Sequence, residues 1–236
     1  MPVHNATSPA VRSDGQLRRR AAILDAARAE LTKHGYDGVT MEGLANCAGV
    51  TRKTLYNQYG TKDELLLAAV SEIIEGYRSL GDGVEPGIPA ILESRRRALR
   101  QIAEKPAYAE AMIRAVSQAP PDHALVDLLF RQGTSFVADQ LRVAQKQGEI
   151  SPDVDLDEMA EQISGHGWGM SAFAAKNVIG LDRLESRSMR GLVILLVSIA
   201  RGRSRRSLMR MLKGEDTTPP SAATNASANT STHAAR

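Results

Sequence analysis

Four side chains within a six-residue stretch carry donors of the kind that bind nucleic acids: Arg52, Lys53, Tyr56 and Asn57. Such groups reach base edges in a groove and phosphate oxygens on the backbone. If the stretch is helical, Leu55 and Tyr59 lie one turn apart and face inward. The four donors are then left pointing outward or toward the N-terminal end. The pattern predicts a surface for a phosphate-rich partner.

The residues around this stretch predict the helices that position it. Thr40 and Thr51 are good N-caps for two short helices, and Gly49 can take positive φ in the turn between them. Gly60 ends the second helix, and Thr61–Glu64 is a capping box that opens a third. Two short helices joined by a glycine-containing turn form a helix-turn-helix, whose second helix enters the major groove of DNA. Any tight helical hairpin can give a similar pattern.

The charge is unevenly distributed along the chain. Residues 1–62 contain nine Lys or Arg against five Asp or Glu, a surplus of +4, whereas the other 174 residues contain 21 against 22, a balance of −1. A basic patch confined to one segment is typical of a polyanion partner, although a solvated basic face would look the same. A second basic cluster is expected to cap a helix C-terminus in water rather than bind phosphate: Arg201, Arg203, Arg205, Arg206, Arg210 and Lys213.

The run from Thr40 to Leu66 resembles the DNA-binding domain of TetR-family transcriptional regulators. It matches the pattern A-G-V-[ST]-x-x-x-L-Y-x-x-[FY]-x-[ST]-K-[DE]-x-L, and the resemblance covers residues 17–70. The rest of the chain is similar only in its length and all-helical layout. The resemblance implies a homodimer with two recognition helices, double-stranded operator DNA with inverted half-sites, and a small-molecule effector bound in the C-terminal domain.

The resemblance also implies a role for individual residues. Thr51, Arg52 and Lys53, at the start of the second helix, are the implied base readers. Phosphate contacts are implied for Thr40, Tyr56, Gln58 and Lys62. The contact of Asn57 is left open, and the threonines would cap their helices even without DNA.

Several residues in or near this segment depart from the pattern or leave alternatives open. Gln58 stands where the family usually has His, so it keeps a donor but loses any charge, and Tyr59 replaces the usual Phe. Arg18–Arg20 precede the first apolar stripe and form either a flexible arm that reaches a neighbouring groove or a solvated one. Cys47 is expected to be a small core residue.

Glycine and proline punctuate a chain that otherwise reads as helix, with no sustained two-residue alternation. We expect an all-α fold, with an N-terminal three-helix helix-turn-helix DNA-binding domain and a C-terminal helical bundle for effector binding and dimerisation. The expected segments are a disordered arm at 1–15, the DNA-binding domain at 16–62, the helical domain at 63–213 and a disordered tail at 214–236.

Within the C-terminal domain we expect helices at 89–105, from 106 to before Pro120, at 125–144, at 159–178 and from Leu184 to about Lys213. The segment Gly191–Ala200 is apolar on every side, so we expect it to be covered on all sides. A second copy of the chain is the simplest cover, and a central position in a monomeric bundle is the alternative.

Five side chains are candidate walls of an effector pocket: Tyr108, Met112, Phe130, Trp168 and Met170. Apolar residues at helical spacing are more often plain core. Gly165, Gly167 and Gly169 are costly inside a helix and indicate either close packing across a dimer seam or a kink that opens a cavity. A regulator controlled by a protein partner, without a small-molecule ligand, is the alternative to effector control.

Other classes of function find little support. The five histidines are scattered, no catalytic or nucleotide-binding motif is present, and we expect no catalytic residues, cofactor or metal. The single cysteine fits a reducing compartment. No apolar run reaches the ~18–20 residues that span a bilayer, and no secretory signal is visible. These features predict a cytoplasmic protein without membrane contact that is not an enzyme.

Overall fold

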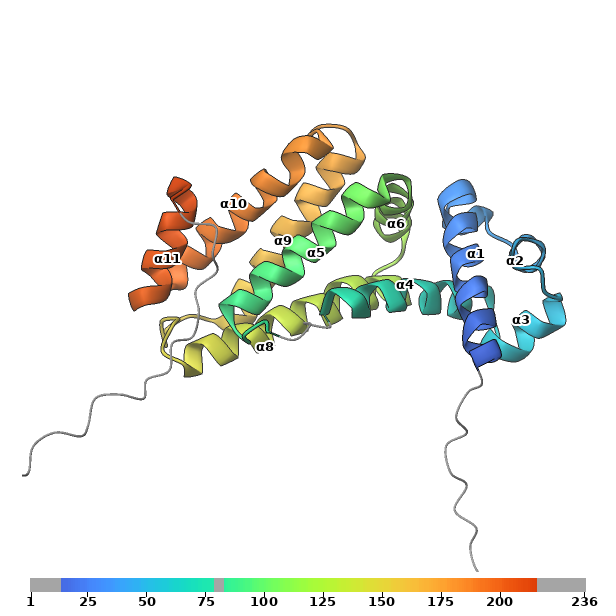
Figure 1. Cartoon of the computed structure of the whole chain (residues 1–236), viewed down its shortest axis with the longest axis horizontal. Helices are drawn as coiled ribbons and strands as arrows, with labels where there is room; N and C mark the ends of the chain where they lie inside the picture. Colours follow the sequence, from blue (N-terminus) through green and yellow to red (C-terminus); the bar gives the residue numbers. More distant parts are fainter. Residues whose placement is uncertain (1–13, 79–82, 216–236) are drawn as a thin grey trace, which may run out of the picture. The chain divides into compact units, whose positions relative to one another are not determined.

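The computed structural model describes residues 14–78 and 83–215, which are helical apart from turns, loops and one bridging residue pair (Figure 1). The all-α prediction is confirmed. The predicted disorder at 1–15 and 214–236 falls almost wholly outside the described residues. In chain order the helices are α1 (Asp14–Gly38), α2 (Met41–Ala48), α3 (Arg52–Tyr59), α4 (Lys62–Arg78), α5 (Ile88–Glu104), α6 (Pro106–Gln118), α7 (Ala124–Val126), a π-helical turn (Asp127–Arg131), α8 (Gln132–Lys146), α9 (Leu156–Ala175), α10 (Leu181–Ile199) and α11 (Gly202–Lys213).

The chain forms two compact units. Unit 1 comprises Met1–Gly76, Gln101–Arg131 and Ser171–Val178, and unit 2 comprises Tyr77–Arg100, Gln132–Met170 and Ile179–Arg236. Unit 1 therefore holds the helix-turn-helix segment together with α6, whereas unit 2 holds α8, α10, α11 and most of α5 and α9.

In unit 1, α1 packs against both α2 and α6. Arg28 of α1 also donates to the Glu72 carboxylate and the Ala69 carbonyl of α4. The helix begins at Asp14, so the expectation that Arg18–Arg20 form a flexible arm is wrong; all three lie inside α1. Large side chains with almost no exposed surface form the core: Ile23, Leu24, Leu31, Leu44, Leu55, Leu65 and Leu66.

Unit 2 is a bundle whose core draws on five helices. Its buried side chains come from α5, α8, α9, α10 and α11, and include Leu92, Leu141, Ile163, Leu196 and Leu208. The segment Leu192–Ile199 is covered largely within its own chain, because Leu192, Val193, Leu196 and Ile199 are buried, while Ile194 is 52% exposed.

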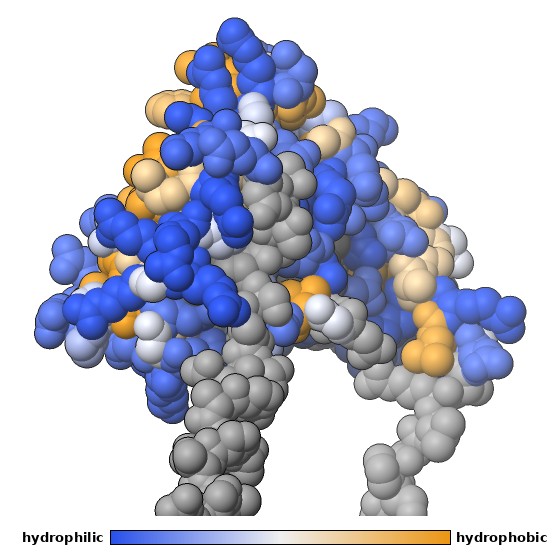
Figure 2. All heavy atoms as spheres, turned by 60° about the vertical axis from the view of Figure 1, so that its left-hand side comes forward, coloured by the Kyte–Doolittle hydropathy of each residue, from blue (hydrophilic) through white to orange (hydrophobic). Residues whose placement is uncertain are grey.

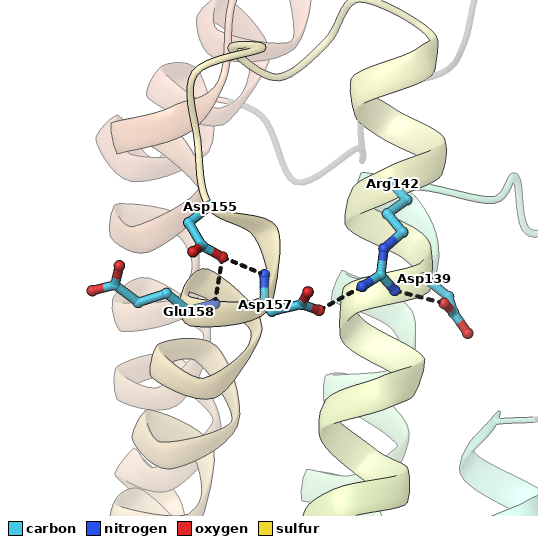
Figure 3. Close-up of polar contacts among 5 residues, drawn as sticks. All are labelled: Asp139, Arg142, Asp155, Asp157 and Glu158. Atoms are coloured by element: carbon cyan, nitrogen blue, oxygen red, sulfur yellow. Dashed lines mark hydrogen bonds and ion pairs between the residues drawn. The ribbon is translucent and has the colours of Figure 1, made fainter.

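An ion-pair network joins α8 to the start of α9 (Figure 3). Arg142 of α8 pairs with Asp139 on its own helix and with Asp157 of α9. Asp155 accepts hydrogen bonds from the backbone amides of Asp157 and Glu158, at 3.0 and 3.1 Å, and so caps α9. These side chains are exposed, so the ion pairs contribute little to the free energy of unfolding.

The helix expected from Leu184 to Lys213 is two helices, and that expectation is wrong. Ala200 has an extended backbone, Gly202 has φ +54°, and Ile150 and Ala200 form a bridge. The amide of Arg201 donates to the Glu149 carbonyl at 2.7 Å. Pairing with a distant loop therefore replaces the helical hydrogen bonds at this point.

One other predicted helix differs from the structure, and one predicted boundary agrees with it. The stretch expected at 125–144 is divided into α7, the π-helical turn and α8. The boundary between α5 and α6 is as predicted, because Lys105 precedes Pro106 and a residue before proline is disfavoured in the helical region.

The second basic cluster lies on α11, whose arginines are exposed while Ser204, Ser207 and Leu208 face the core. Hydrophilic side chains gather over this side of unit 2 in Figure 2. Arg210 and Lys213 lie in the last turn, where a cation is favourable to the helix dipole. Among the described helices, none combines the length and apolar character needed to cross a bilayer.

Candidate nucleic-acid interface

Residues close together in the sequence cap the helices on either side of the turn between α2 and α3. The Thr40 hydroxyl accepts a hydrogen bond from the Gly43 amide at 3.1 Å, which starts α2. Gly49 ends that helix in the left-handed conformation, at φ +64°, where a side chain would be strained. The Thr51 hydroxyl then accepts from the Thr54 amide at 3.2 Å and starts α3. The predicted caps at these positions are confirmed.

Helix α3 buries one residue and exposes the predicted donors. Leu55 has no exposed surface, whereas Tyr56 is 53% exposed. The side chains available to a partner are those of Thr51, Arg52, Lys53, Tyr56, Asn57 and Gln58, all of them exposed. Neither Arg52 nor Lys53 pairs with an acidic side chain in the described part of the chain. The helix therefore presents two unneutralised cations, a phenol and two amides on one short element.

The start of α4 is a capping box, as predicted. The Glu64 carboxylate accepts from the Thr61 amide at 2.8 Å, and the Glu64 amide donates to the Thr61 hydroxyl at 3.1 Å. Gly60 ends α3 at φ +76°, and a Cβ there would overlap the Glu64 carboxylate. The positive φ favours glycine between α3 and α4, and a side chain there would also displace the Glu64 carboxylate from its cap.

Lys62 is held by Tyr36, which the sequence did not single out. The Lys62 ammonium donates to the Tyr36 carbonyl at 3.3 Å and lies 5.2 Å from the centre of the Tyr36 ring. An ammonium has three donors, so this contact leaves others for a phosphate. The carbonyl and the ring restrict where the cation can lie.

Tyr36 is itself fixed on two other sides. Its hydroxyl donates to the Asp63 carboxylate at 2.8 Å, and its ring meets His123 edge-on, with 5.3 Å between ring centres. Burial, the hydrogen bond to Asp63 and the nearby negative charges of Asp63 and Asp37 raise the pKa of the Tyr36 hydroxyl, so the phenol stays protonated. Tyr36 thus joins the end of α1, the start of α4 and the turn before α7.

Cys47 is exposed on α2, and the expectation that it belongs to the core is wrong. Met41, Leu44 and Ala45 are the residues of α2 that pack inward. Cys47 lies at the edge of this buried face, near the end of the helix, and its side chain is exposed.

The five candidate pocket residues are divided between the two units. Tyr108, Met112 and Phe130 belong to unit 1, and Trp168 and Met170 belong to unit 2. Tyr108 lines an open hollow of about 360 Å³ between α1 and the start of α6, together with Arg28, Thr32 and Pro106. Met112 is buried and the other four are half-buried. Their joint role as pocket walls stays a prediction.

The three glycines of α9 have different surroundings. A Cβ at Gly167 would overlap the guanidinium of Arg95, so a side chain of the same chain accounts for this glycine. No described atom lies within 4 Å of a Cβ built on Gly165 or Gly169. Close packing within one chain therefore explains only the central glycine.

Sequence comparisons match the segment that contains α2 and α3 to known regulators. The sequence model described as "Bacterial regulatory proteins, tetR family" matches residues 23–69. The transcriptional repressor KstR of Rhodococcus jostii is 34% identical over 153 residues, which cover 58% of this chain and 71% of that protein. The uncharacterized HTH-type transcriptional regulator YezE of Bacillus subtilis is 29% identical over 177 residues, covering 70% of this chain and 90% of the relative.

Solved structures share the fold at lower identity. A TetR transcription regulator from Haloarcula marismortui superposes with a TM-score of 0.63 at 21% identity, covering 78% of this chain and 100% of that one. The fatty acid degradation regulator FadR from Bacillus halodurans gives 0.64 at 18% identity, covering 75% and 97%.

The Tyr36 hydroxyl should stabilise the fold, whereas the Tyr56 hydroxyl should not. Tyr36→Phe removes a hydrogen bond to a carboxylate and should lower the free energy of unfolding by about 1 kcal/mol. Tyr56→Phe removes an exposed hydroxyl and should change it by less than about 0.5 kcal/mol. Urea denaturation of the two matched variants measures both values. If both variants lose the same free energy of unfolding, the Tyr36–Asp63 hydrogen bond does not stabilise the start of α4.

Proposed function

We propose a specific activity for this chain, which belongs to the TetR family of bacterial transcriptional regulators: it is a repressor that a small-molecule effector releases from its operator. The chain would act as a homodimer on double-stranded DNA with inverted half-sites, in the cytoplasm. Its relative KstR is named as a transcriptional repressor, which supports repression over activation.

The observation that supports DNA binding best is the exposure of α3. An eight-residue helix offers Arg52, Lys53, Tyr56 and Asn57 to the outside while Leu55 anchors it. A helix of this size fits the major groove of B-DNA, which is ~12 Å wide. The exposed cations have no acidic partner among the described residues, so they are available to a polyanion.

The contacts divide into two classes. We assign base reading to the start of α3, where Thr51, Arg52 and Lys53 would enter the groove first. Contacts with the phosphate backbone are assigned to Thr40, Tyr56, Gln58 and Lys62, with Asn57 open to either class. Thr40 and Lys62 stand at the starts of α2 and α4, where free amides and the helix dipole favour a phosphate.

Release by an effector follows from a shift between conformations of the dimer. Two recognition helices must match half-sites spaced by ~34–36 Å, and an effector that prefers another spacing lowers operator affinity. The loss is limited to the difference in effector affinity between the two conformations, typically ~1–3 kcal/mol. Control by a protein partner would leave operator binding unchanged by every small molecule in a footprinting assay.

Arg52→Ala tests the base-reading assignment. Footprinting on the DNA upstream of the chain's own gene first identifies the operator. Loss of a bidentate contact should then weaken binding to that operator by ~1–3 kcal/mol and relax the preference at one or two base pairs. Binding to random DNA should change much less. Equal weakening on both duplexes, measured by fluorescence anisotropy, would place Arg52 among the phosphate contacts instead.

Lys62→Met tests the phosphate assignment. The substitution keeps an apolar stem beside Tyr36 and removes the charge. It should weaken operator and random DNA alike and lower the slope of log affinity against log salt by about one unit. Lys33→Met, an exposed lysine of α1 outside the assigned set, is the matched control. An unchanged slope in Lys62→Met, or the same change in both variants, contradicts the assignment.

A further inference from the structure

Arg95, in the middle of α5, is withdrawn from water without a counter-charge. Its Nη2 donates to the Ile163 carbonyl of α9 at 3.0 Å, and no carboxylate among the described residues pairs with it. Its neighbours on the same helix differ, since Arg97 and Arg100 both pair with Glu93. Desolvation by burial lowers the pKa of Arg95 to about 10, so the side chain is still charged at neutral pH.

The backbone of α9 is shaped to receive this side chain. A Cβ at Gly167 would overlap the Arg95 guanidinium, so the planar group lies directly against the helix backbone. The glycines one half-turn before and after, Gly165 and Gly169, have open space instead. A glycine inside a helix costs roughly 1 kcal/mol relative to alanine, and at Gly167 the seating of Arg95 is the compensating reason.

A desolvated charge of this kind is stable only when an opposite charge or several hydrogen bonds compensate for the lost water. One carbonyl uses one of the five guanidinium N–H donors, and the rest suit two oxygens in a plane. Arg95 keeps a small exposed surface, so the site is not completely sealed from solvent. No side chain among the described residues supplies the opposite charge, which leaves the position open to a small anion.

We propose that Arg95, seated on Gly167, binds the carboxylate of the small-molecule effector. This inference rests on the proposed control by an effector and adds its chemical class. A guanidinium carries one positive charge and presents its N–H donors in one plane. These match the single negative charge and the planar shape of a carboxylate. A phosphate monoester shares the oxyanion chemistry but carries a larger charge that a lone guanidinium neutralises only in part.

Calorimetric titration of the full-length chain without DNA tests the proposal. The probes are acetate, benzoate and octanoate, each compared with its own neutral amide, with phenyl phosphate as the phosphate-ester arm. At least one acid should bind ten times or more tightly than its amide. Arg95→Met should weaken that acid by about ten- to a hundredfold, the usual worth of hydrogen bonds to a charged group, and leave its amide unchanged.

A second pair of variants tests the geometry without changing charge. Gly167→Ala should displace the guanidinium and weaken acid binding by a similar factor, whereas Gly169→Ala, where space is open, should not. Arg97→Met controls for loss of a positive charge on α5. Urea denaturation confirms that each variant folds; Arg95→Met removes an uncompensated charge and is expected to be at least as stable as the parent chain.

Several outcomes overturn the proposal. It fails if no acid binds more tightly than its amide, if the preference survives both Arg95→Met and Gly167→Ala, or if only phenyl phosphate binds. Because these titrations contain no DNA, a failure here leaves the operator measurements on Arg52 and Lys62 standing. A chain that binds the acid through Arg95 but shows no operator preference would instead contradict the proposed repressor function.

Discussion

The burial of Leu55 is the constraint on which the candidate interface depends. Helix α3 has only eight residues, too few to be stable alone, so tertiary packing must hold it. Leu55 is the single buried residue of that helix and has no exposed surface. Leu55 faces the core and Thr51 caps the first turn, and together they fix the rotation of α3 about its axis. The side chains of Arg52, Lys53 and Tyr56 therefore face solvent.

Tyr36 extends this constraint beyond the helix-turn-helix. Through Lys62, Asp63 and His123 it ties the end of α1 to the start of α4 and to the turn that precedes α7. A displacement of that turn would move the Tyr36 ring, and through the ring the Lys62 ammonium. This gives unit 1 a physical connection between a residue assigned to phosphate binding and a segment outside the DNA-binding helices.

Structural features that depend on residues close together in the sequence could be predicted, whereas those that depend on distant residues could not. The caps at Thr40, Thr51 and Thr61 were predictable, because each hydroxyl bonds an amide three residues away. The break at Ala200 was not, because it depends on pairing with Ile150 in a distant loop. Lys62 over Tyr36 and Arg95 against Gly167 are likewise contacts between separate helices. The glycine spacing indicated close packing at Gly167, but nothing local in the sequence identifies Arg95 or Tyr36 as the partner.

Amide hydrogen exchange of the full chain, with and without its operator duplex, tests the central claim most directly because the chain has two basic surfaces. The account predicts that exchange slows at residues 51–59 and at the first turn of α4, and that α11, despite its exposed arginines, is unaffected. Slowing confined to α11, with α3 unchanged, would contradict it.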